Sequence, residues 1–213
     1  MQAVFFDFDG TLLDTETDIR ETYRITFRQF GLTADQASFR IGPSLPDTVR
    51  MLRPEASETE LREILTAFSR NYDRSGFPAT RCYDGVREML EALHGTIPLF
   101  IATNKRLAPT ELLLAKFQLQ DYFDQVYASD MLLPVRRLSK LEMLQRGLAE
   151  HGLNPADCAI VGDTVSDIRG GREAGMRTVA VRWGYAAPGE FSDPAPDRIA
   201  DAPAEVPALL KTL

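Results

Sequence analysis

The sequence has few of the residues that define several common functional classes. Its 213 residues include only two cysteines, Cys82 and Cys158, which lie far apart and form no Cys-x-x-Cys pair. This spacing supports neither a disulfide framework nor a zinc site, so we expect two ordinary thiols. Basic residues are fewer than acidic ones: the chain has 24 Lys and Arg but 31 Asp and Glu, which gives a net charge of −7. With Lys and Arg scattered as well, the composition argues against a nucleic-acid-binding surface and favours a small-molecule partner.

Histidines and long apolar runs are equally scarce. His94 and His151 each stand directly before a glycine at the end of a helical pattern, which predicts helix C-caps rather than catalytic groups. No apolar run reaches the length of a membrane span, and the chain does not open with a basic segment and an apolar signal region. We therefore expect a cytoplasmic protein without a membrane partner. A hydrophobic content of 44% suffices for one core and a small accessory domain.

The most informative stretch covers residues 3–14 and reads Ala-Val-Phe-Phe-Asp-Phe-Asp-Gly-Thr-Leu-Leu-Asp. Its apolar start predicts a buried strand whose end carries polar groups. Because alternate residues of an extended chain point to the same side, Asp7 and Asp9 would bring two negative charges together unless a cation binds or one takes a proton. Gly10 permits a sharp turn, and Thr11 adds a hydroxyl. The stretch favours a phosphate-handling turn over an ordinary Asp-Gly turn with solvated acids.

Residues 15–80 predict helices without an intervening strand. Apolar residues recur at helical spacing over residues 15–30 and 58–72, and a shorter candidate covers residues 47–52. A single crossover connection rarely takes this many residues. We therefore predict a separate all-helical cap domain over residues 15–80, which closes as a lid over the acids.

After Gly85 the sequence alternates between helical and strand patterns. The predicted strands cover residues 97–102, 125–128, 158–161 and 178–181. This alternation predicts an α/β core domain of residues 1–14 and 81–213, with a doubly wound, Rossmann-like parallel sheet. Ligands of such sheets gather at the carboxyl ends of the strands, where the sequence places Asp7, Thr103 and Asp163.

Four sets of residues together resemble the signature motifs of one enzyme family. Asp-Phe-Asp-Gly-Thr at residues 7–11 is similar to the first motif of the haloacid dehalogenase-like (HAD) superfamily. Thr103, Lys140 and the run at residues 162–167, Gly-Asp-Thr-Val-Ser-Asp, resemble the second, third and fourth motifs in the expected order. The resemblance implies a phosphate-monoester phosphatase that works through an aspartyl-phosphate.

Further segments resemble the phosphoglycolate phosphatase-like branch of this superfamily. They are residues 168–176, residues 181–185, and Ile41-Gly42-Pro43-Ser44-Leu45 in the predicted cap. In that branch the last of these corresponds to a loop that dips toward the active site. The resemblance thus spans nearly the whole chain and implies a small phosphorylated metabolite as the substrate.

The resemblance also implies a role for each matching residue. Asp7 would be the nucleophile and Asp9 the general acid and base, a second acid that the dehalogenases of the superfamily lack. Thr103 would bind a phosphoryl oxygen, and Lys140 would offset the negative charge. Substrate contacts are also expected from Gly10, Thr11 and Asn104.

The third motif leaves a choice between three basic residues. Leu141 stands where the family often has a proline after the motif lysine, and Arg136 and Arg137 are close enough to compete with Lys140. The register of Lys140 relative to the Ser139 cap favours the lysine.

A magnesium ion is the implied cofactor. Its direct ligands would be a carboxylate oxygen of Asp7, the main-chain carbonyl of Asp9 and the side chain of Asp163, with Asp167 bound directly or through water. Oxygen ligands of this kind suit octahedral Mg²⁺, and the ion would resolve the repulsion between the acids.

Other interpretations remain open from the sequence alone. A phosphomutase shares the chemistry and differs only in the acceptor. A signalling receiver also forms an aspartyl-phosphate on a parallel sheet, but it needs no helical insertion and has no use for Asp9. A non-catalytic binding protein is disfavoured because all the acids are present. Substrate choice would depend on cap side chains such as Arg20, Arg24, Arg40 and Arg50, and the protein would be a monomer or a homodimer.

Overall fold

A computed structural model describes residues 1–32, 45–132 and 136–213. Its chain divides into two compact units, one formed by residues 1–14 with 82–213 and the other by residues 15–81. Predicted loop residues 41–44 and the predicted specificity residue Arg40 lie outside the described residues, while Leu45 is the first residue of a helix. Among the described residues, no helix combines the length and the apolar character needed to cross a membrane.

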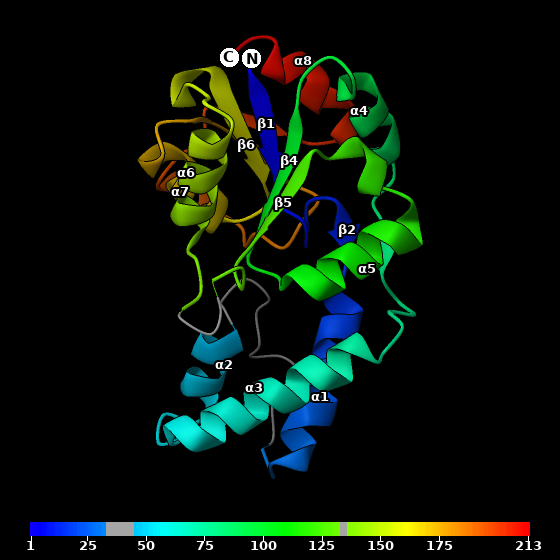
Figure 1. Ribbon diagram of the computed structural model, residues 1–213, viewed down its shortest axis with the longest axis vertical. Helices are drawn as coiled ribbons and strands as arrows, with labels where there is room; N and C mark the ends of the chain where they lie inside the picture. The colour runs from blue at the N-terminus through cyan, green and yellow to red at the C-terminus, as the bar shows by residue number, and fades with distance from the viewer. Residues whose placement is uncertain (33–44, 133–135) are drawn as a thin grey trace. The chain divides into compact units, whose positions relative to one another are not determined.

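The larger unit is built on a six-stranded sheet with the order β5-β4-β1-β6-β7-β8 (Figure 1). The strands are β1 (Ala3–Phe6), β4 (Leu99–Thr103), β5 (Gln125–Ala128), β6 (Cys158–Gly162), β7 (Arg177–Val181) and β8 (Arg198–Ala200). All five neighbouring pairs are parallel, which confirms the predicted α/β fold. Strand β8 was not predicted, because its three residues at the sheet edge are too few to carry a pattern.

Helices cover both faces of this sheet. They are α4 (Val86–Leu93), α5 (Leu107–Phe117), α6 (Lys140–Glu150), α7 (Val165–Glu173) and α8 (Val206–Leu210). Helices α6 and α7 lie side by side on one side of the sheet, and α4 and α8 lie on the other (Figure 1). Among the described residues of this unit, short 3-10 helices also occur at Gln120–Tyr122, Pro155–Asp157, Glu190–Ser192 and Pro203–Glu205.

Strand β1 lies in the middle of the sheet and is fully buried. It pairs with β4 on one side, where Phe6 aligns with Ile101, and with β6 on the other, where Phe6 aligns with Val161. Because parallel strands end at the same edge of a sheet, the residues that follow β1, β4 and β6 emerge side by side.

The smaller unit contains α1 (Glu16–Gln29), α2 (Leu45–Leu52) and α3 (Glu58–Asp73). Helix α1 packs on α3 through aromatic side chains, with the rings of Tyr23 and Phe68 4.6 Å apart. Helix α2 begins two residues before the predicted start at Asp47. Up to residue 80, the described residues of this unit contain helices and loops but no strand.

The two ends of the smaller unit are held together by Asp18 in the first turn of α1. This buried carboxylate accepts hydrogen bonds from Thr80 N at 2.7 Å and from Thr80 Oγ1 at 2.6 Å. Ala79 N donates to it as well. At the two ends of the unit in the sequence, β2 (Leu13–Asp14) and β3 (Arg81–Cys82) pair with each other as a two-stranded sheet. Both linkers are therefore fixed at neighbouring points.

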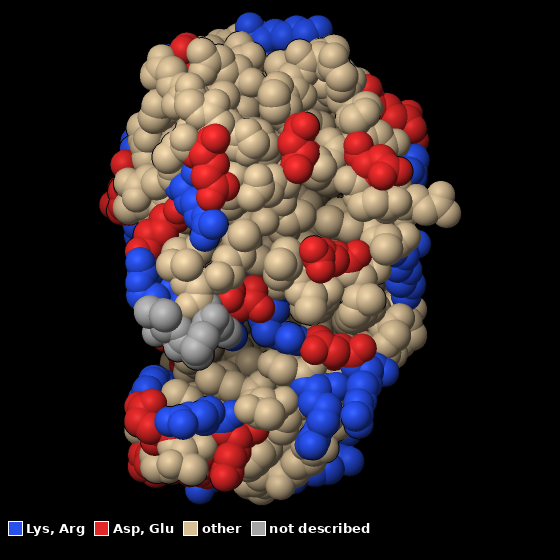
Figure 2. Space-filling model, in the orientation of Figure 1, with Lys and Arg blue, Asp and Glu red and all other residues tan. Residues whose placement is uncertain are grey.

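The predicted positions of the two histidines at helix C-caps are confirmed. His94 and His151 are the C-caps of α4 and α6, and the glycine after each has a positive φ, 74° at Gly95 and 61° at Gly152. Both cysteines are free thiols. On the face of the larger unit drawn in Figure 2, acidic and basic side chains are interspersed and form no basic stripe.

Candidate active site

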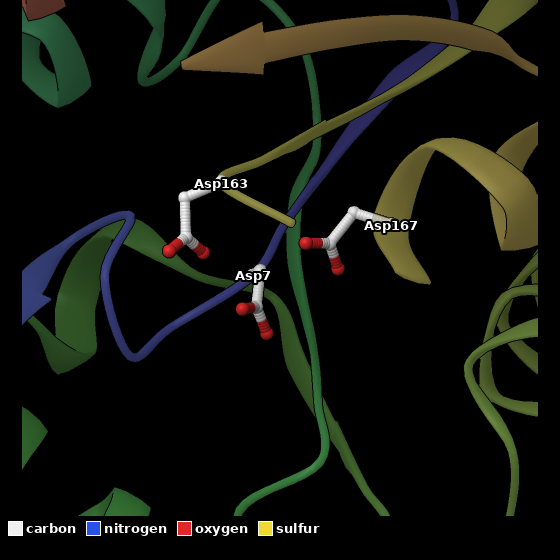
Figure 3. A group of neighbouring side chains, drawn as sticks. All are labelled: Asp7, Asp163 and Asp167. Atoms are coloured by element: carbon white, nitrogen blue, oxygen red, sulfur yellow. The ribbon is translucent and has the colours of Figure 1, made fainter. Parts of the chain in front are cut away.

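Three carboxylates converge at the carboxyl end of the sheet (Figure 3). Asp7 directly follows β1, Asp163 directly follows β6, and Asp167 lies in the first turn of α7. One oxygen of each lies within 4.8 Å of the corresponding oxygens of the other two, and all three side chains are buried. The structure thus brings together acids that lie far apart along the chain. The cause is the pairing of β1 with β6, which Asp7 N extends by donating to Val161 O at 2.9 Å.

Lys140 is the basic residue that meets these acids. Its ammonium nitrogen lies 2.8 Å from Asp7 Oδ1 and 2.8 Å from Asp167 Oδ1, and it donates to Ala102 O at 2.6 Å. The side chain is only 4% exposed. Gly170 in α7 leaves room for the lysine stem, since a Cβ there would lie 2.8 Å from Lys140 Cγ.

The two competing arginines are engaged elsewhere. Arg136 pairs with Glu142, which also completes the capping box of α6 with Ser139. Arg137 donates to Ser129 Oγ at 3.0 Å. Of the three basic residues considered for the third motif, Lys140 is the one in contact with the acids.

Burial dominates the electrostatics of the acid cluster. It raises the pKa of Asp7 from 3.8 to about 7, although Lys140 opposes the shift. Burial, followed by the charges of Asp7 and Asp167, raises the pKa of Asp163 well above its ordinary range. Burial alone would lower the pKa of Lys140, but Asp167 and Asp7 raise it above its usual value. One ammonium therefore does not compensate the three acids, and a further cation would.

The cluster has the donor set of a site for a hard divalent cation. Asp167 Oδ2 accepts hydrogen bonds from Thr164 N at 3.0 Å and from Thr164 Oγ1 at 2.8 Å, which fixes the carboxylate. Asp167 Oδ1 is buried and forms an ion pair with Lys140. Carboxylate oxygens are the preferred protein ligands of Mg²⁺. Asp7, Asp163 and Asp167 therefore fit a magnesium ion.

A loop after β7 supports Asp163. Tyr185 N donates to Asp163 Oδ2 at 2.8 Å, and Thr11 Oγ1 donates to Asp163 Oδ1 at 3.2 Å. Trp183 Nε1 in turn donates to Thr11 O at 3.0 Å. The fit requires glycine at residue 184, because a Cβ there would lie 2.3 Å from Asp163 Cβ and 2.4 Å from the carbonyl oxygen of Gly10.

Gly10 and Thr11, predicted as substrate contacts, are both buried beside Asp163. Gly10 has φ of +83°, and a Cβ on it would lie 2.1 Å from Asp163 Oδ2. The hydroxyl of Thr11 is fully buried in its bond to Asp163. Their observed contacts orient an acid, and their contact with substrate remains a prediction.

Asp9 is not one of the three clustered acids, and its carboxylate pairs with Lys105. The lysine nitrogen lies 2.9 Å from Oδ1 and 3.0 Å from Oδ2 of Asp9. The Lys105 side chain is 5% exposed and that of Asp9 18%. Lys105 was not among the predicted site residues. Its available signal was its position two residues after Thr103, at the end of a buried strand.

Thr103 and Asn104 occupy the end of β4. Thr103 is buried, and its Oγ1 accepts a hydrogen bond from Lys105 N at 3.1 Å. The residue Asn104 is exposed, and its carbonyl oxygen accepts a hydrogen bond from Ser129 Oγ at 2.8 Å. The structure thus places Thr103 at the same sheet edge as the acids.

Comparison with known proteins matches this arrangement to one family. The family model described as haloacid dehalogenase-like hydrolase matches residues 4–181, which is most of the chain. The chain belongs to the haloacid dehalogenase-like hydrolases. Phosphoglycolate phosphatase of Nitrosospira multiformis is 32% identical over 194 residues, covering 87% of this chain and 85% of the relative. Membership of this hydrolase family and such relatives identify the chain as a phosphatase.

Two further similarities widen the comparison. Tyrosine-protein kinase PtkA of Mycobacterium tuberculosis is 29% identical over 189 residues, covering 86% of this chain and 63% of that protein. A haloacid dehalogenase-like family hydrolase from Streptococcus pneumoniae matches the structure with a TM-score of 0.86 at 28% identity, covering 98% of each chain. The family fold therefore extends over nearly all of this chain.

Proposed function

We propose that the protein is a Mg²⁺-dependent phosphatase that hydrolyses a small phosphorylated metabolite through an aspartyl-phosphate on Asp7. The observation that carries the proposal is the contact of one buried lysine, Lys140, with both Asp7 and Asp167 beside Asp163. A nucleophilic carboxylate needs positive charge close by, since it must approach an anionic phosphoryl group.

In the first step Asp7 attacks phosphorus while the bond from phosphorus to the ester oxygen breaks. Lys140 holds Oδ1 of Asp7, which leaves Oδ2 as the attacking atom. The departing alkoxide takes a proton from Asp9 and leaves as an alcohol. In the second step Asp9 takes a proton from water as the water oxygen attacks phosphorus, the bond to Asp7 breaks, and inorganic phosphate leaves.

Other residues of the chain bind and balance charge during these steps. Thr103, at the end of β4, donates a hydrogen bond to a phosphoryl oxygen, and Lys140 offsets the charge of Asp7 and the phosphoryl group. Gly10, Thr11 and Asn104 contact the substrate. Asp7, Asp163, Asp167 and the carbonyl of Asp9 hold Mg²⁺, which supplies positive charge to the phosphoryl oxygens when bound.

The smaller unit supplies the lid in this proposal. Its helices, predicted as a cap domain over residues 15–80, close over the acids and exclude bulk water while Asp7 attacks the substrate. The relative named phosphoglycolate phosphatase supports a small phosphorylated acid as substrate. A cytoplasmic location and a monomeric or homodimeric state belong to the same proposal. A phosphomutase would use the same groups, with a sugar hydroxyl replacing water.

The test is a panel of phosphomonoesters, including phosphoglycolate, nucleotides and sugar phosphates, with pyrophosphate alongside, assayed with Mg²⁺ and with excess chelator. We expect phosphate release from at least one compound only when Mg²⁺ is present. Acid quenching during turnover should trap hydroxylamine-labile phosphate on the protein, and Asp7→Asn should trap none. Full turnover in chelator would contradict the proposal. An aspartyl-phosphate that persists for many minutes in the wild type would favour a signalling receiver.

A further inference from the structure

A second lysine, Lys105, contacts Asp9, the acid that lies outside the three-carboxylate cluster. Lys105 arrives from the end of β4, the sheet neighbour of β1, and its ammonium contacts both carboxylate oxygens of Asp9 at 2.9 and 3.0 Å. Its own backbone is tied down, because Lys105 N donates to the buried Thr103 Oγ1 at 3.1 Å. The stem and ammonium are therefore held from the strand that also carries Thr103.

This contact differs from an ordinary surface ion pair. A pair between long exposed side chains is screened by water and contributes little to geometry. Here Lys105 is 5% exposed, so little water competes for the ammonium. Contact with both oxygens also restricts rotation of the Asp9 carboxyl group, which contact with one oxygen would not do.

Orientation is what a general acid and base requires. Asp9 has to reach first the departing ester oxygen and then the attacking water, each at hydrogen-bond distance. It lies in a tight turn, where Gly10 N donates to Leu13 O at 2.8 Å, so its backbone is fixed. The freedom that remains is rotation of the short side chain, and Lys105 removes it.

We propose that Lys105 is a positioning residue that holds the Asp9 carboxyl group in its working orientation. The inference rests on the proposed function, in which Asp9 transfers the protons. It assigns a role to a residue outside the four motifs of the family. Lys140 positions the nucleophile, and Lys105 positions the acid and base.

The test is a double-mutant cycle with Asp9→Asn, Lys105→Met and the double variant, measured on the best phosphomonoester from the panel. Lys105→Met should lower kcat by roughly 10- to 100-fold, since a small misplacement of a catalytic group has effects of this size. KM should change less than threefold. The double variant should be no slower than Asp9→Asn, because a positioning residue has no effect once its target is inactive. Lys116→Met, an exposed lysine on α5, is the matched control and should keep wild-type turnover.

A second readout separates positioning from a general loss of structure. Lys105→Met and Asp9→Asn should both lose more rate on an alkyl phosphate than on p-nitrophenyl phosphate, whose leaving group needs little protonation. A merely structural defect would lower both rates equally. Lys105→Arg should recover part of kcat, and melting curves of every variant show whether it is folded. If Lys105→Met does not fold, the same comparisons are made with Lys105→Gln.

Three further outcomes would overturn the inference, and they are distinguishable. Losses that multiply in the double variant would mean that Lys105 acts independently of Asp9. A raised KM with unchanged kcat would make Lys105 a substrate-binding residue. Wild-type turnover in Asp9→Asn alone would remove Asp9 from the mechanism and the inference with it. The first two leave the proposed function intact, whereas the third revises it.

Discussion

The charged residues at the candidate site of the larger unit and those on α1 of the smaller unit are held in different ways. In the larger unit, Lys140 is buried and joins acids from two other elements, the end of β1 and helix α7. In the smaller unit, two of the arginines predicted as specificity residues pair with acids one turn away on α1, Arg20 with Glu16 and Arg24 with Glu21. Surface pairs of this kind are cheap to rearrange, whereas a buried pair is not. The proposed function assigns the buried, fixed charges to the chemistry and the surface arginines to substrate recognition.

The largest expected effect comes from the nucleophile. Asp7→Asn should reduce turnover by roughly 10⁵-fold or more, because an amide cannot form the aspartyl-phosphate. Its melting temperature should equal or exceed that of the wild type, since the change removes one of three crowded negative charges. Phosphate release and thermal melting measure the two quantities. Retained turnover would assign the nucleophile elsewhere and weaken the contrast between the units.

Removing the buried ammonium group of Lys140 should have the next largest effect. Lys140→Met leaves Asp7 and Asp167 buried without their ammonium, and loss of one partner of a buried pair costs roughly 3–5 kcal/mol. Urea unfolding in chelator measures the free energy of unfolding. Saturating Mg²⁺ should recover part of the loss by replacing the missing positive charge. A cost below about 1 kcal/mol would place Lys140 with the surface pairs.

Metal-free protein should lose stability as the pH rises from about 4 to about 7. Burial raises the pKa of Asp7 from 3.8 to about 7 in the folded protein. Between these values the folded state binds more protons than the unfolded state, so the free energy of unfolding falls with rising pH. Unfolding curves in chelator across this range check the sign. Asp7→Asn should make the free energy of unfolding less dependent on pH. A rise in the stability of the wild type over the same pH range would contradict the prediction.

The smallest effect is expected in the helical unit. Glu16→Gln removes the partner of Arg20 on α1 and should change the free energy of unfolding by less than about 0.5 kcal/mol, as exposed i,i+4 pairs do. Urea unfolding in parallel with Lys140→Met gives the comparison directly. An effect as large as that of Lys140→Met would remove the distinction between the two units.

Local patterns carried most of the predictable information. The run at residues 3–14 predicted both the buried strand and the position of Asp7 at its end, because strand periodicity and turn residues are properties of neighbouring residues. The order of strands and helices then predicted a parallel sheet, whose topology alone gathers Asp7 and Asp163 at one edge. The three-acid cluster follows from these two facts.

Contacts made across the fold were harder to foresee. The pairing of Lys105 with Asp9 and the bond from Thr11 to Asp163 each join segments far apart in the sequence. No periodicity marks which lysine will meet which acid, since this depends on how neighbouring strands align. Lys140 was preferred over Arg136 and Arg137 because its helix cap fixed its register, and the structure places it in contact with Asp7 and Asp167.

The central position of β1 in the sheet affects how the chain folds during its synthesis. Val4 pairs with Leu99 and Ala3 with Cys158, so this strand waits for two partners that leave the ribosome much later. Until then its phenylalanines and both of its edges lack their native cover, which is the condition that invites aggregation. Asp7 likewise meets its ammonium only after residue 140 has been synthesised. A chain truncated before β6 would therefore contain β1 and Asp7 but lack one of the two strands that neighbour β1 and the other two acids of the cluster.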